Sequence, residues 1–288
     1  MTRRALLTLA GAAATPLGAP AAGDAGRKSR LRTAICAYSY RDALAKKSMT
    51  YDDLVRLAVD LDVDGLDLTV YWFPNRTPEF LLPLRRLAYR NGIEIYSISI
   101  RTEMTRATAD QRTQEVANIT GWIDAAEHLG AGHIRVFGGN VPKTSTAEEA
   151  TPWVVEVLSR AADYAGRKGI ILGLENHGGI TDRAEKIIEI VQKVDSPWVG
   201  INLDTGNFRT DVFRQIEACL PWAVNVQVKA EMRDESGKSV PQNWKRVIEL
   251  LRKSAYRGYL ALEYEAKEDP ATAVPRLIAE LKRVIAQA

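Results

Sequence analysis

Residues 169–179 read GIILGLENHGG, an apolar run between glycines that ends abruptly in an acid, an amide and an imidazole. The run Ile170–Leu174 is too short and too continuously apolar for an amphipathic helix, which indicates a strand buried on both faces. Such strands belong to parallel sheets, and the residues just beyond their carboxyl ends face an open crevice or a barrel mouth. Glu175 and His177 are therefore expected where ligands bind. The alternative for Glu175 is a structural role, as a helix cap or as the partner of an arginine.

Strands of this kind alternate with helical periodicity along the chain. Buried strands are short apolar or alternating runs, whereas helices carry apolar residues three or four positions apart. The predicted strands are Arg32–Tyr38, Gly65–Val70, Ile93–Ile100, His133–Gly138, Ile170–Leu174, Trp198–Leu203, Ala223–Lys229 and Tyr259–Tyr264. The predicted helices are Tyr51–Leu61, Pro78–Asn91, Asp110–Leu129, Thr146–Lys168, Arg183–Val194, Asp211–Leu220, Trp244–Ser254 and Thr272–Ala286. We expect Thr181 and Asp182 to cap the helix that begins at Arg183.

Eight strand-then-helix units in series predict an α/β fold, the closed (β/α)8 TIM barrel. No pair of strands has hairpin spacing, so an antiparallel sheet is not expected. A doubly wound open sheet is the alternative. It is disfavoured because no G-x-G-x-x-G sequence follows the first strand and because eight units exceed its usual number.

Length and composition agree with one barrel. The chain has 288 residues, of which 46% are hydrophobic and 26% are charged, and its formal net charge is +3. A barrel needs roughly 250 residues, and so small and scattered a charge argues against a nucleic-acid or anionic-membrane partner. Cys36 and Cys219 are expected to be buried free thiols, with a disulfide as the alternative.

The amino-terminal segment, positions 1–28, has the order of an export signal. Paired arginines at positions 3 and 4 precede a mildly apolar run, Leu6–Ala14, and Ala19-Pro20-Ala21 follows as a candidate cleavage site. The arginine pair is typical of a twin-arginine signal, and the run is too short for a membrane span. We expect a signal and linker in residues 1–28, a barrel domain in residues 29–288, and export to the periplasm. A flexible, alanine-rich tail is the alternative.

The last four strands each end near a residue with an oxygen that can bind a metal. These residues are Glu175, Asp204, Gln227 and Glu263. If all four project toward one mouth, the three carboxylates need a cation or protons to offset their repulsion. Four oxygen ligands without a thiolate suit Mn²⁺ or Mg²⁺. The alternative is that the same groups form ion pairs with Arg101, Arg135 and Lys229.

The motifs around these residues resemble those of a known superfamily. They are Glu175-Asn176-His177, Leu203-Asp204-Thr205-Gly206-Asn207, Val226-Gln227-Val228-Lys229 and Leu262-Glu263-Tyr264. Together they look like the xylose isomerase-like barrels, the sugar phosphate isomerase/epimerase superfamily. Its members include tagatose-type epimerases, hydroxypyruvate isomerase, inosose dehydratase, 3-dehydroshikimate dehydratase and endonuclease IV. The resemblance covers essentially the whole chain beyond the expected signal and linker.

The resemblance implies a metal site and two catalytic acids. It makes Glu175, Asp204, Gln227 and Glu263 the metal ligands, and Glu175 and Glu263 the paired acid and base on opposite faces of a ketose. The metal would polarise the carbonyl group and stabilise an enediolate. Most members carry histidine where this chain has Gln227, and the loss of an imidazole disfavours zinc.

Other candidates flank these motifs. On an extended segment His177 shares a side with Glu175, so it would relay a proton, bind a substrate hydroxyl or only support a ligand. Lys229 and Glu231 follow Gln227 at alternate positions and would bind the substrate or each other. Arg135 faces inward by parity and would orient a substrate oxygen or an acid.

Three aromatic residues follow the second predicted strand. Trp72, with Tyr71 and Phe73, would bind the apolar face of a sugar or simply pack. His128 and His133 lie near the opposite end of the barrel and are expected to be structural.

We therefore expect a divalent-metal-dependent isomerase or epimerase of a small sugar or keto-sugar. A lyase or dehydratase that eliminates next to a ketone is the alternative, and a non-catalytic sugar-binding protein is a further one. A repair endonuclease is disfavoured because its three-metal site is rich in histidine. Export and the lack of a phosphate loop argue against a phosphorylated substrate. The expected partner is a small carbohydrate, without nucleic acid or a membrane span, and a homo-oligomer is left open.

Overall fold

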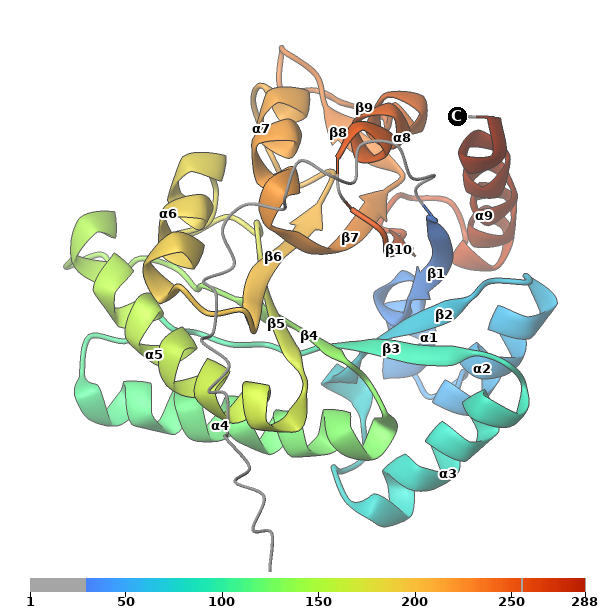
Figure 1. Ribbon diagram of the computed structural model, residues 1–288. Helices are drawn as coiled ribbons and strands as arrows, with labels where there is room; N and C mark the ends of the chain where they lie inside the picture. Colours follow the sequence, from blue (N-terminus) through green and yellow to red (C-terminus); the bar gives the residue numbers. More distant parts are fainter. Residues whose placement is uncertain (1–29, 255, 288) are drawn as a thin grey trace, which may run out of the picture.

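Eight parallel strands close into a barrel in the computed structural model, which describes residues 30–254 and 256–287 (Figure 1). Around the barrel the strands follow the order β1, β10, β7, β6, β5, β4, β3, β2. They are β1 (Arg32–Cys36), β2 (Gly65–Thr69), β3 (Glu94–Ser99), β4 (His133–Phe137), β5 (Ile171–Glu175), β6 (Val199–Asp204), β7 (Ala223–Lys229) and β10 (Tyr259–Glu263). The predicted TIM barrel is confirmed, and its strands agree with the predicted ranges to within two residues at each end. The predicted export signal lies outside the described residues.

Helices surround the barrel on its outer side (Figure 1). They are α1 (Arg41–Ala45), α2 (Tyr51–Asp60), α3 (Pro78–Arg90), α4 (Ala109–Leu129), α5 (Ala147–Lys168), α6 (Ala184–Val194), α7 (Val212–Cys219), α8 (Trp244–Lys253) and α9 (Pro270–Gln287). Short 3-10 helices are η2 (Ala37–Tyr40), η3 (Val70–Trp72) and η4 (Leu220–Trp222). Among the described residues no helix is long and apolar enough to cross a membrane.

Local sequence signals define the helix that leads into β5. At the start of α5, Thr146 Oγ1 accepts a hydrogen bond from Glu149 N (3.2 Å) and Glu149 Oε2 accepts one from Thr146 N (2.8 Å). This reciprocal capping box satisfies amides that have no partner within the helix. The helix ends at Gly169, whose φ of 68° lies in the left-handed region that glycine adopts without strain. The chain therefore turns directly into the apolar run that predicted the fold.

Successive side chains on each strand point alternately outward and inward. The outward residues are aliphatic and form one large buried layer with the helices, as Leu172 and Leu174 of β5 and Leu203 of β6 do. The inward residues are mostly small or polar, and they include Asp67, Ser97, Ser99, Asn202 and Asn225. The main apolar core therefore lies between strands and helices, and the inward residues combine polar groups with a smaller buried cluster of Ala34, Cys36, Tyr96 and Ala261.

His133 is one of the inward residues and contributes to structure, as predicted. Its Nδ1 lies 2.8 Å from Ser97 Oγ, and burial lowers the pKa of its imidazole to about 3. A Cβ atom at Gly173 on the neighbouring strand would lie 2.2 Å from His133 Nε2. Glycine at this position therefore makes room for the histidine ring inside the barrel.

Two local predictions were wrong. A two-stranded antiparallel hairpin, β8 (Glu231–Arg233) and β9 (Ser239–Pro241), follows β7, although no hairpin was expected. The cap of α6 is Arg183 rather than Thr181 or Asp182, and it makes no side-chain capping bond. Instead, Ala184 N donates to Gln215 Oε1 of α7 at 2.8 Å, so a neighbouring helix satisfies this terminus. Both cysteines are buried and free, as predicted.

Candidate functional site

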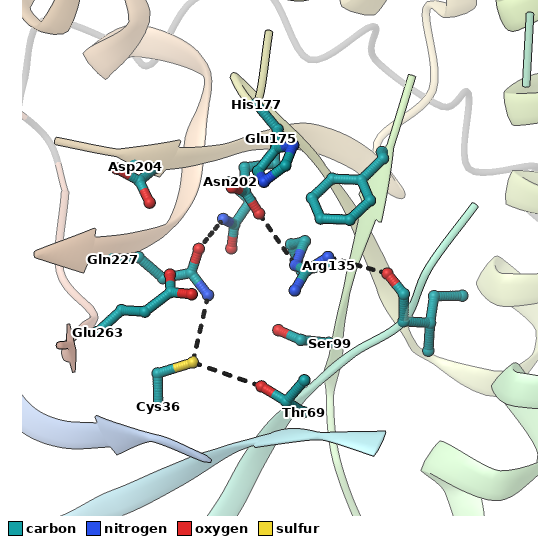
Figure 2. A network of polar contacts seen from close by, with 12 residues as sticks. Cys36, Thr69, Ser99, Arg135, Glu175, His177, Asn202, Asp204, Gln227 and Glu263 are labelled. Carbon is teal, nitrogen blue, oxygen red and sulfur yellow. Dashed lines mark hydrogen bonds and ion pairs between the residues drawn. The ribbon is translucent and has the colours of Figure 1, made fainter. Parts of the chain in front are cut away.

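Three acids gather inside the barrel at the carboxyl ends of the strands. Glu175 is the last residue of β5, Asp204 of β6 and Glu263 of β10. Figure 2 shows these side chains, with Gln227 of β7, directed toward a common space. All are buried, with no more than 6% of any residue exposed. The structure thus brings together the four residues that the sequence placed at the barrel mouth. We call Glu175, Asp204 and Glu263 the acid cluster.

Glu175 has two partners that hold its carboxylate. Arg135 Nε of β4 lies 2.9 Å from Oε2, and Asn207 Nδ2 donates to Oε1 at 3.0 Å. Burial raises the pKa of Glu175 well above its usual range, an effect that Arg135 opposes and that Asp204 and Glu263 reinforce. Arg135 is therefore the counter-ion of Glu175. Of the two roles expected from the sequence, orienting a substrate oxygen or orienting an acid, this contact corresponds to the second.

Asp204 and Glu263 share a different cation. Lys229 Nζ, at the end of β7, lies 3.3 Å from Asp204 Oδ2 and 3.3 Å from Glu263 Oε2, and it also contacts Glu265. Burial is the main cause that raises the pKa of Asp204 and brings that of Glu263 to about 7. Burial alone would lower the pKa of Lys229, but the three surrounding carboxylates raise it well above its usual value. Ion pairs of the acids with Arg135 and Lys229, the alternative to metal binding that the sequence left open, are therefore present.

The Gln227 amide is hydrogen-bonded to residues outside the acid cluster. Its Oε1 accepts a hydrogen bond from Asn202 Nδ2 at 2.8 Å (Figure 2). Its Nε2 donates to Asp67 Oδ2 at 2.8 Å. Asn225 Nδ2 in turn donates to Asn202 Oδ1 at 2.8 Å, and Tyr96 donates to Asn225 Oδ1 at 3.2 Å. A buried amide needs such partners, because leaving them unpaired costs about 1–3 kcal/mol. The oxygen proposed as a metal ligand is thus already engaged.

A divalent metal fits this site in donor chemistry but not in the present arrangement. Carboxylate and amide oxygens suit a hard cation, and Asp204 Oδ2 is a buried oxygen whose neighbour is the Lys229 ammonium, 3.3 Å away. However, no three histidines, cysteines or acids of the described chain lie close enough together to hold a metal. The place between Asp204 and Glu263 is taken by the Lys229 ammonium. A metal here requires Lys229 to move and Gln227 to reorient.

His177 lies at the rim rather than beside the Glu175 carboxylate. Its amide donates to Glu175 O at 3.0 Å, so the segment turns instead of continuing extended as expected. The ring packs on Phe137, with centroids 4.1 Å apart. His177 is exposed, but its ring is partly shielded from water by the surrounding protein. This desolvation is the main cause that lowers the pKa of His177 to about 4, and the positive charges of Arg135 and Lys229 add to it. Its imidazole is consequently neutral at physiological pH.

The aromatic residues after β2 separate into two groups. Trp72 stacks on Tyr38 of η2 at 6.1 Å, and Tyr71 meets both rings edge-on. Phe73 packs elsewhere, against Tyr51 of α2, so it belongs to the outer layer. Trp72 and Tyr71 are half-buried, and Tyr71 Oη accepts a hydrogen bond from Arg135 at 3.1 Å. Tyr71 thus connects the aromatic rim to the acid cluster.

A pocket of about 170 Å³ opens beside the acid cluster, between Lys229, Glu265 and the β8–β9 hairpin. Glu231 lines this pocket and is exposed. Its Oε2 accepts a hydrogen bond from Ser239 of β9 at 2.7 Å, whereas Lys229 pairs with the acids of β6 and β10. Glu231 therefore faces solvent at the pocket.

Sequence reasoning missed two residues of this site. Glu265 follows Glu263 at the alternate position and contacts Lys229, and Asn207 holds Glu175. Glu265 could have been found from its spacing, because it lies two positions after Glu263. Asn207 stood within one of the motifs but had no assigned role, because its partner belongs to a different strand.

The comparisons with known proteins agree with this geometry. The family model for the xylose isomerase-like TIM barrel matches residues 55–284, so the chain belongs to that family. A comparison with curated protein sequences gives no significant match.

Solved structures with the same fold carry several functions. A D-psicose 3-epimerase determined with D-fructose has a TM-score of 0.72 and 16% identity, over 89% of this chain and 97% of that one. The IOLI protein with a bound zinc atom has a TM-score of 0.73 and 14% identity, over 89% of this chain and 98% of that one. A probable 3-DHS dehydratase, AsbF from Bacillus anthracis, has a TM-score of 0.66 and 16% identity, over 88% of this chain and 98% of that one. Identities this low establish a shared fold only.

Proposed function

We propose that this chain is a divalent-metal-dependent isomerase or epimerase that acts on a small sugar or keto-sugar through an enediolate. The observation that carries the proposal is the acid cluster, three buried carboxylates on β5, β6 and β10 whose pKa values burial raises. Carboxyl groups whose pKa values lie above the ordinary range suit proton transfer at carbon. Mn²⁺ or Mg²⁺, held by the acid cluster and a reoriented Gln227, would polarise the substrate carbonyl group.

Two carboxyl groups of the protein would transfer the protons. Glu263, buried at the end of β10, accepts the proton from the carbon next to the carbonyl group. Glu175 returns a proton from the other side, because β5 and β10 are separated in the barrel by β6 and β7. Arg135 holds Glu175 in place through its 2.9 Å ion pair. Trp72 and Tyr71 offer an apolar face for the sugar ring at the rim.

Proton exchange tests the proposal directly. The full-length chain, loaded with Mn²⁺ or Mg²⁺, is incubated in D₂O with a panel of ketoses and keto-glycosides, and NMR detects deuterium at the carbon next to the carbonyl group. Glu175→Gln and Glu263→Gln should each lower turnover by about 100-fold or more. Glu268→Gln is the matched control, because this exposed acid pairs with Arg276 and lies outside the acid cluster. A panel that shows neither exchange nor inversion contradicts the proposal.

A lyase that eliminates water or an alkoxide next to a ketone is the second candidate. The observation in its favour is His177, an exposed imidazole at the rim that stays neutral above pH of about 4 and can therefore act as the base in place of Glu263. In this reaction one base and one proton donor suffice. If His177→Ala abolishes turnover while Glu263→Gln leaves it nearly intact, elimination replaces epimerisation as the function.

A further inference from the structure

Lys229 is held by hydrogen bonds at its backbone, and its charged end contacts carboxylates. Its amide donates to Thr205 Oγ1 at 3.2 Å, and its carbonyl oxygen accepts from Trp244 Nε1 at 2.8 Å. The aliphatic stem passes over Gly206, where a Cβ atom would lie 2.6 Å from Lys229 Cγ. Glycine at position 206 thus provides the path along which the lysine reaches the acid cluster.

The ammonium group bridges an inner and an outer set of acids. Asp204 and Glu263 have 0% and 7% of their side chains exposed, whereas Glu265 has 43% exposed. Lys229 contacts all three, so a short rotation would leave it with Glu265 alone. Glu265 provides an outer partner that keeps the lysine paired when it leaves the inner acids.

Arg135, the other cation of the site, cannot move in this way. Its guanidinium donates to Ile100 O at 2.9 Å and to Tyr71 Oη at 3.1 Å, and it stacks on Phe137 at 4.0 Å. The residue is only 2% exposed. Lysine has a flexible stem and a single charged point, whereas this arginine is fixed by several directional contacts.

Charge also favours an exchange of cations. When ionised, Glu175, Asp204, Glu263 and Glu265 carry four negative charges, against two positive charges on the paired Arg135 and Lys229. Two cations at contact distance from the same carboxylates repel each other strongly in a buried site. A divalent ion and the Lys229 ammonium therefore compete for Asp204 and Glu263.

We infer that Lys229 is a built-in competitor of the metal: it neutralises Asp204 and Glu263 in the metal-free protein and moves to Glu265 when a divalent cation binds. The inference rests on the metal dependence proposed above. It adds that Glu265 is part of the metal-binding equilibrium although it is not a ligand.

Calorimetric titration of chelator-treated protein with Mn²⁺ alone tests the competition. Lys229→Met keeps the length of the stem and removes the competitor, so Mn²⁺ should bind at least about tenfold more tightly. Without metal, the same variant should melt at a lower temperature than the unaltered protein, because Asp204 and Glu263 lose their counter-ion. Lys186→Met is the matched control, because Lys186 also contacts two acids, Glu148 and Glu189, but on the outer helices. Its Mn²⁺ affinity should change by less than about twofold.

A double-mutant cycle separates the exchange from general electrostatics. Glu265→Gln should weaken Mn²⁺ binding several-fold in the unaltered protein, because the displaced lysine loses its outer partner. In the Lys229→Met background the same change should have little effect. An equal effect of Glu265→Gln in both backgrounds overturns the exchange, as does Mn²⁺ affinity that Lys229→Met leaves unchanged or lowers. If Mn²⁺ binds none of the variants, both this inference and the proposed metal dependence are wrong. If Mn²⁺ binds the unaltered protein and Lys229→Met does not increase its affinity, only the competition is refuted and the proposed metal dependence stands.

Discussion

Leu203 and Asp204 are neighbours on β6, both fully buried, and they belong to opposite environments. Leu203 faces the helices in the main apolar layer, and Asp204 faces the inside of the barrel among ionised groups. The same alternation separates Val228 from Lys229 and Leu262 from Glu263. Burial therefore says little about function in this protein. What matters is the side of the strand on which a buried residue lies.

The two sides make opposite contributions to stability. Burial of apolar side chains in the outer layer is favourable at roughly 25 cal/mol per Å². Burial of charges inside the barrel costs free energy that ion pairs repay only in part. The raised pKa values of Glu175, Asp204 and Glu263 express that cost. We infer that the outer layer provides the stability that lets the interior carry a reactive site.

The largest effect is expected when one member of the inner ion pair is removed. Arg135→Met leaves Glu175 buried without its counter-ion and should lower the free energy of unfolding by roughly 3–5 kcal/mol at pH 8. Urea unfolding of the metal-free protein measures this change. The double variant with Glu175→Met should be more stable than the single one, because it buries no unpaired charge. A double variant as unstable as Arg135→Met would mean that the pair itself stabilises the fold.

An outer-layer change should be nearly as costly for a different reason. Leu203→Ala removes apolar contacts and leaves a cavity, which should lower the free energy of unfolding by roughly 2–5 kcal/mol. Leu82→Ala on α3 is the control, because Leu82 is 46% exposed, and it should change stability by no more than about 0.5 kcal/mol. Equal losses in the two variants would contradict the assignment of the main core to the layer between strands and helices.

The smallest effect depends on pH. The pKa of Glu263 is about 7 in the folded protein and 4.5 in its ordinary state, so the folded state binds the proton more tightly. The resulting stability is fully present below pH 4.5 and is lost as pH rises through 7. Relative to the metal-free unaltered protein, Glu263→Gln should therefore gain on the order of 2 kcal/mol between about pH 4.5 and pH 8. His177, which titrates in the opposite sense, is present in both proteins and cancels. Parallel stability curves for the two proteins would show that Glu263 titrates normally.

Predictions from the sequence were best where local pattern suffices. The ends of β5, β6 and β7 follow from short apolar runs, and inward parity placed Arg135 and the acids correctly. The β8–β9 hairpin was missed because each strand has three residues and little apolar signal. The start of α6 was misjudged because its partner, Gln215, is 31 residues away in the chain.

The sequence by itself determined the barrel and the strand ends that carry acids, because alternation along a strand needs only the order of residues. Only the tertiary structure decided which group each acid contacts. Lys229 lies among Asp204, Glu263 and Glu265, and Gln227 is turned toward Asn202 and Asp67. These contacts join residues on different strands, and their distances are set by the closure of the barrel and by side-chain reach. A linear pattern contains neither quantity, so the partners of the buried charges could not be predicted from it.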